Sequence, residues 1–129
     1  MTSARTRRAD LLRTRARANR AASAERRATA RAARRVRAGA RSLTTHVIAL
    51  GVSRETVKGV AKALQGVAKK ERSNGLKGKR ARIRRTARGF KRHAVTVYRY
   101  TRAQVAQIAA QYKPRKPEYK AVRAALIAA

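Results

Sequence analysis

The large apolar side chains are concentrated in the middle of the chain. Residues 1–42 contain four of them, whereas residues 43–67 contain nine. Four of the nine recur at spacings of three and four residues, which is typical of one face of a helix: Val57, Val60, Leu64 and Val67. A hydrophobic core can therefore begin near residue 43, but not in the first third of the chain.

Two helices are predicted around this apolar segment. Ser42 is a good N-cap for a helix over residues 43–50, and Gly51 then breaks that helix. Ser53 can cap a second helix, which we expect over residues 54–70 because the spaced apolar positions lie within it. The apolar segment is thus predicted to be two helices joined by a short turn.

The first third of the chain has a different pattern. Residues 4–38 are rich in Arg and Ala, which are strong helix formers, and predict one long helix, at least when a polyanion neutralises the arginines. The segment has no wide apolar stripe, so we expect little of it to dock on the core. Gly39 is the expected stop. We interpret residues 1–41 as a basic arm or helix and residues 42–129 as the folded domain.

The region after the second helix is predicted to contain short elements. Gly78 and Gly89 bracket a short predicted helix that contains Ile83. Residues 94–100, AVTVYRY, are rich in β-branched and aromatic side chains and fit one short strand. No obvious partner strand is nearby, so continuation of a helix is the alternative.

The last part of the chain predicts a pair of helices. Thr101 and Gln104 have the spacing of a capping box, and the helix that they begin should run to about Tyr112. Pro117 fits the first position of a final helix that ends in the apolar residues Leu126 and Ile127. The fold class expected from all these elements is all-α or mainly α.

The net charge of the chain indicates the class of partner that it binds. The chain carries 36 basic and 5 acidic residues, so its net charge is +31, yet residues 43–67 account for only +2 of it. So much charge on 129 residues favours a polyanionic partner, and nucleic acid is the commonest. A membrane surface is the competing reading. It is disfavoured because Ala, rather than Leu, Phe or Trp, accompanies the arginines.

Composition also excludes several chemistries. The absence of cysteine rules out disulfides, zinc knuckles and thiol catalysis. His46 and His93 are isolated and the acids are scattered, so we expect no metal, no cofactor, no small-molecule substrate and no enzymatic activity. No apolar run is long enough for a membrane span. We expect a cytoplasmic, nucleoid-associated protein, or one packaged with DNA in a virion.

The segment LTTHVIALGVSRETVKGVAK resembles the helix-turn-helix motif of DNA-binding proteins from bacteria, phages and plasmids. Gly51 falls at the turn position of that motif, and Ser53 opens its second helix. The motif's apolar positions are occupied by Val47, Leu50, Val52, Val57 and Val60. One departure is Val47, which stands where the family usually has Ala. The resemblance covers residues 43–62 and implies a helix-turn-helix core with residues 54–70 as the recognition helix.

The resemblance implies which side chains contact double-stranded DNA. Candidates for base contacts are Ser53, Arg54, Glu55, Lys58 and Lys62. The basic flanks supply candidates for phosphate contacts, namely Arg31, Arg34, Arg35, Arg37, Arg41, Lys77, Lys79, Arg80, Arg82, Arg84, Arg85, Arg88, Lys91 and Arg92. The alternative for Glu55 is that it only stabilises the start of its helix, and for the lysines that they form a solvated face.

Residues 101–127 resemble the same motif more weakly, because a capped helix, a turn and a helix are again expected there. This segment is either a second DNA-reading unit, or a helical hairpin that completes the core or forms a homodimer contact. The four tyrosines suit the core or a groove lining better than base stacking.

The leading function is a sequence-specific DNA-binding protein that regulates transcription or serves a plasmid or phage as an accessory factor. Two alternatives stay open. One is a protein of the nucleoid or virion that compacts DNA without reading its sequence. The other is an RNA-binding or ribosome-associated protein, which fits the composition but lacks the aromatic residues that stack on RNA bases.

Overall fold

The structure, a computed structural model, describes residues 3–86 and 92–129. Its helices are α1 (Ala4–Ala38), α2 (Leu43–Ile48), α3 (Arg54–Ser73), α4 (Arg102–Gln111) and α5 (Pro117–Ala128). Two strands, β1 (Lys79–Thr86) and β2 (Arg92–Arg99), lie between α3 and α4. The expectation of a mainly α fold with a long N-terminal helix and C-terminal helices is confirmed.

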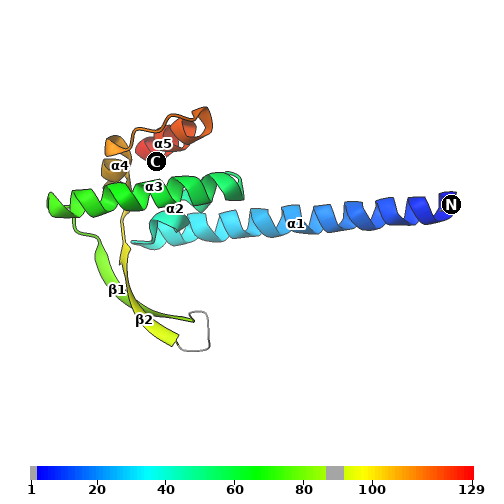
Figure 1. The fold of residues 1–129 in the computed structure, drawn as a ribbon, viewed down its shortest axis with the longest axis horizontal. Helices are drawn as coiled ribbons and strands as arrows, with labels where there is room; N and C mark the ends of the chain where they lie inside the picture. Colours follow the sequence, from blue (N-terminus) through cyan, green and yellow to red (C-terminus); the bar gives the residue numbers. More distant parts are fainter. Residues whose placement is uncertain (1–2, 87–91) are drawn as a thin grey trace.

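Helix α1 is a 35-residue rod that begins on the Ser3 cap and stops at Gly39. It extends far beyond the other elements, and only its C-terminal part lies against them (Figure 1). There it packs on α2 and buries Ala32. Our expectation that little of α1 would dock is correct for most of its length. The expectation is wrong for the last turns of α1, where small residues such as Ala32 allow a close approach without a wide apolar stripe.

The core forms where α2, α3, α4 and α5 meet. Helix α3 places Val57, Val60 and Leu64 in it, as the three- and four-residue spacing predicts, and Val67 packs at its edge. Val47, the departure from the helix-turn-helix pattern, is fully buried in this cluster. The core therefore begins at residue 43, where the apolar pattern begins.

The turn between α2 and α3 is tight. Leu50 and Gly51 donate backbone hydrogen bonds to the carbonyls of Val47 and Ile48, and Gly51 has a φ of 76°. A positive φ of this size is strained for a residue with a side chain, so glycine is required here. Ser53 then caps α3 by accepting from the Thr56 amide at 3.4 Å.

The hairpin corrects the prediction for residues 78–89. The expected short helix around Ile83 is wrong, because residues 79–86 form β1 and pair antiparallel with β2. Ile83 faces Val95 and Ala81 faces Val97, and all four side chains are half-buried. The strand expected near 94–100 is confirmed as β2, with β1 as the partner that was missing. The two strands form a curved β-hairpin that projects from the helices (Figure 1).

Helices α4 and α5 form a helix pair that completes the core. Thr101 and Gln104 make the predicted capping box, and Pro117 opens α5. The core cluster contains Val105, Ile108 and Tyr112 from this region, together with Val122 and Leu126. The Gln104 side chain also donates to the Lys77 carbonyl at 2.9 Å, which ties the base of the β-hairpin to α4.

Candidate nucleic-acid interface

The exposed face of α3 brings together three of the predicted base-contact residues. Arg54, Lys58 and Lys62 follow one another at intervals of four residues and are all exposed. Successive helical residues turn by about 100°, so these three lie within an arc of about 80°. The buried residues of α3 hold this arc in place, because they fix the helix against α2, α4 and α5.

Ser53 and Glu55 have structural roles that coexist with the predicted contacts. The Ser53 hydroxyl caps α3 and lies 2.8 Å from the Thr56 hydroxyl. Glu55 is the acidic residue of the first turn, where the helix dipole favours a negative charge. Both side chains are exposed. The geometry therefore leaves both as predictions for base contact.

Two residues that sequence reasoning missed extend this face. Gln65 and Lys69 are exposed and lie in the same arc, three and seven residues after Lys62. We name the set Arg54, Lys58, Lys62, Gln65 and Lys69 the α3 row. Its ends are about 22 Å apart along the helix. The spacing of three and four residues was visible in the sequence, but only the exposed side of α3 identifies the row.

A groove of about 470 Å³ adjoins the α3 row. It lies between the start of α2, the α3 residues Gln65 and Arg72, and strand β2. The Arg72 guanidinium stacks over the Tyr98 ring at 3.5 Å and donates to the Tyr100 hydroxyl at 3.4 Å. Within the described residues, the buried Nε of Arg72 has no hydrogen-bond partner. Arg72 thus couples α3 to the hairpin, a role that depends on tertiary contact and left no sequence signal.

The hairpin presents several of the predicted phosphate contacts. Arg80, Arg82 and Arg84 alternate along β1 and are exposed, so they share one side of the strand. Lys77 and Lys79 are exposed at its base. Of the remaining candidates, Arg85 and Arg92 are strand residues of β1 and β2, whereas Arg88 and Lys91 fall outside the described residues.

The candidates around α1 are divided between two surroundings. Arg31, Arg34, Arg35 and Arg37 are exposed on the helix. Arg41 is half-buried and donates through Nε to the Arg35 carbonyl at 3.1 Å, so it also closes the end of α1. The structure therefore does not gather the predicted phosphate contacts on one surface.

A second cavity shows which part of α1 is close to α3. A space of about 630 Å³ separates α1 from the α2–α3 turn, and its lining includes Arg26 and Arg54. Arg54 at the start of the α3 row is therefore adjacent to the arm, whereas Gln65 is adjacent to the hairpin. The α3 row lies between two basic elements.

Little of this positive charge is neutralised within the chain. In the described ranges, the one ion pair joins Arg13 and Asp10 at 3.7 Å, and both side chains are exposed. The sequence has no acidic residue between Glu71 and Glu118, so the hairpin lacks internal counter-charges. The arrangement can bind a polyanion without first breaking buried salt bridges.

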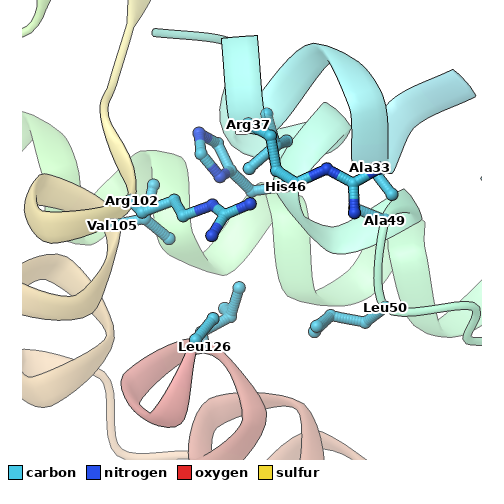
Figure 2. Close-up of a pocket in the computed structure, with 10 residues that line it drawn as sticks. Ala33, Arg37, His46, Ala49, Leu50, Arg102, Val105 and Leu126 are labelled. Carbon is cyan, nitrogen blue, oxygen red and sulfur yellow. The ribbon is translucent and has the colours of Figure 1, made fainter. Parts of the chain in front are cut away.

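His46, which the sequence left without a role, is buried at the junction of α2 and β2. Its Nε2 donates to the Tyr100 carbonyl at 2.7 Å, and Arg41 and Tyr100 exchange backbone hydrogen bonds beside it. A cavity of about 190 Å³ opens next to it, and Arg37 and Arg102 lie between His46 and the apolar pair Leu50 and Leu126 (Figure 2). The imidazole thus serves as a structural link between the two elements.

The surroundings of His46 lower the pKa of its side chain. Burial lowers the pKa of the imidazole below its ordinary value of 6.5, and the positive charge of Arg102 lowers this pKa further. The hydrogen bond to the Tyr100 carbonyl opposes both effects but is weaker than the burial. The lowered pKa favours a neutral ring that donates through Nε2.

Comparisons and searches of the described residues add no further assignment. No helix among them has both the length and the apolar character needed to cross a membrane. They also hold no cluster of three or more His, Cys, Asp or Glu residues placed to bind a metal ion. No protein-family model, curated protein or solved structure matches the chain significantly. The geometry and charge of this chain therefore carry its functional assignment.

Proposed function

We propose that this chain is a double-stranded DNA-binding protein of the helix-turn-helix type, with α3 as its recognition helix. The observation that carries the proposal is the α3 row, an exposed and uncompensated polar face on a helix held by the core. We infer that the protein is a sequence-specific regulator, or an accessory factor of a plasmid or phage. It is proposed to be a non-enzyme that acts in the nucleoid or in a virion.

The α3 row supports readout in the major groove. That groove is about 12 Å wide and accepts a helix, and its base edges carry a distinct pattern for each base pair. Arg54 can bond guanine O6 and N7, and Glu55 can accept from cytosine N4. Lys58 and Lys62 reach bases or phosphates farther along. Their positions on one arc support simultaneous contact with a single groove.

The hairpin and the arm support the phosphate contacts. Arg80, Arg82 and Arg84 lie on one side of β1, and Arg26 lines the same cavity as Arg54. Phosphate contacts fix the register of a protein on the duplex but carry no sequence information, whereas base contacts specify the site. We therefore assign specificity to α3 and most of the affinity to the elements on its two sides.

One alternative is favoured by a specific observation. The charge of +31 exceeds what a single site-specific contact requires, which fits a protein that coats and compacts DNA. Such a protein would use α3 as one more phosphate-binding surface.

Selection from a random duplex-DNA library separates the two functions. The full chain is mixed with the library at roughly 200 mM salt, where binding through phosphates alone is weakened. The proposal expects one enriched sequence motif, and a palindromic motif would indicate a two-fold dimer. Strong retention without an enriched motif would contradict sequence reading and favour compaction. Preference for structured RNA over duplex DNA would contradict both.

A further inference from the structure

A regular row of arginines follows α1 from Arg13 to Arg34. We name it the back row: Arg13, Arg17, Arg20, Arg27, Arg31 and Arg34. Arg13, Arg20, Arg27 and Arg34 are spaced by seven residues, and a seven-residue repeat drifts by only about 20° per step on a straight helix. The six side chains lie within an arc of about 100° and span about 32 Å along the axis.

The back row faces away from the rest of the protein. The side of α1 that meets the body is marked by Ala32, which is buried, and by Thr29, whose methyl group is close to Gly51. The centre of the back row lies about 145° around the helix from that side. All six arginines are exposed, and within residues 3–86 and 92–129 their one ion pair joins Arg13 to Asp10, which is also exposed.

A second set of arginines lies on the side of α1 that adjoins α3. Arg8, Arg15 and Arg26 fall within about 20° of one line along the helix. We name them the near row. Arg26 lines the same cavity as Arg54. A duplex that lies on the α3 row therefore meets the near row, while the docked end of α1 prevents the helix from turning its back row toward that duplex.

We propose that the back row binds a second segment of double-stranded DNA, so that one chain holds two duplexes together. This inference rests on the proposed function, because it assumes that α3 and the hairpin bind the first duplex. The row is about as long as one helical turn of DNA, which is roughly 34 Å. No large apolar residue lies in its arc, which instead includes small residues such as Ala16 and Ala24, so it lacks the apolar surface that a membrane partner requires.

A bridging assay with matched variants tests the proposal. One duplex is immobilised on beads, a second duplex of unrelated sequence carries a fluorophore, and the full chain is added. Bridging is the fluorescence retained per protein bound to the beads. Affinity for one duplex is measured separately by fluorescence anisotropy. The variants are Arg17→Gln/Arg20→Gln/Arg27→Gln for the back row, which leave the predicted phosphate contacts intact, and Arg8→Gln/Arg15→Gln/Arg26→Gln for the near row. Each removes three charges from α1, and Gln keeps the helix propensity close to that of Arg.

The two variants are expected to behave in opposite ways. The back-row variant should lose bridging by about tenfold or more while its single-duplex affinity changes by less than about threefold, since three phosphate contacts are lost from the second duplex alone. The near-row variant should lose single-duplex affinity by about tenfold and keep its bridging per bound protein.

Two other results would overturn the inference. If both variants lose single-duplex affinity equally and neither loses bridging per bound protein, both rows grip the same duplex and α1 is not a bridge. If the unmodified chain binds one duplex in the anisotropy assay but retains no second duplex, bridging fails while the proposed function stands. Absence of any duplex binding in anisotropy would instead remove the proposed function itself.

Discussion

Helices α1 and α3 are both long and basic, but they differ in what holds them. Five residues of α3 are buried, whereas α1 buries one residue, Ala32. The apolar residues of α3 recur at helical spacing and enter the core, while Leu11 and Leu12 of α1 are 70% and 60% exposed. Charge alone therefore does not indicate where a helix lies. A continuous apolar face along the helix indicates that it packs on the core.

The difference separates two ways of using arginine and lysine. On α3 most of the basic residues occupy one arc, because the buried residues of the helix face the core. On α1 they surround the projecting part, because nothing packs there. A fixed arc suits reading one groove, whereas charge on several sides suits contact with more than one polyanion. Substitutions on the two helices and at His46 test this difference.

Truncating a large apolar side chain should lower the free energy of unfolding strongly on α3 and hardly at all on α1. Leu64 of α3 is fully buried, so Leu64→Ala is expected to reduce the free energy of unfolding by about 2–5 kcal/mol through lost contacts and a cavity. Leu11→Ala should change it by less than about 0.5 kcal/mol, because Leu11 contacts solvent. Urea denaturation of both variants measures the two values. A loss at Leu11 comparable to that at Leu64 would mean that the arm packs on something.

Two glycines of α3 distinguish its packed side from its open side. A Cβ at Gly59 would overlap the Tyr119 ring of α5, whereas a Cβ at Gly66 meets nothing within 4 Å. Gly59→Ala is expected to destabilise by about 1–3 kcal/mol, since Tyr119 must move. Gly66→Ala should stabilise by up to about 1 kcal/mol through helix propensity. Thermal unfolding of both variants measures the difference, and equal stabilisation would show that Tyr119 does not pack on α3.

The pH dependence of stability should be the smallest effect, and its sign is the test. Because the pKa of His46 is lowered in the folded protein, the unfolded chain takes up this proton first as the pH falls below about 6.5. The free energy of unfolding should therefore be highest above pH 6.5 and decrease as the pH falls toward the lowered pKa. Denaturation between pH 7.5 and 5.5 measures it, and His46→Gln is the control. A variant that keeps the full slope would assign the effect to another group.

Local chemistry was the part of the fold that the sequence predicted well. The caps at Ser42, Ser53 and Thr101 and the proline at the start of α5 all depend on residues within one helical turn of one another. Such interactions leave short, fixed spacings in the sequence. Arg54, Lys58 and Lys62 were predicted from the helix-turn-helix resemblance, and their common face follows from helical periodicity.

The features that were missed depend on contacts between distant segments. Residues of strand β1 were predicted as a short helix between Gly78 and Gly89, although Arg80, Arg82 and Arg84 alternate with Ala81 and Ile83. Pairing with β2 decides the outcome. Arg72 depends on Tyr98, and His46 depends on Tyr100, 54 residues away. No local spacing encodes either contact.

We propose that α3 contacts bases while the β-hairpin contacts phosphates. The most direct test measures the affinity of Arg54→Ala and Arg84→Ala for the selected site and for a random duplex, at the same salt concentration. Arg54→Ala is expected to lose roughly 1–3 kcal/mol on the selected site and much less on the random duplex. Arg84→Ala should weaken binding to both equally. Equal losses on both duplexes for Arg54→Ala would contradict sequence reading by α3.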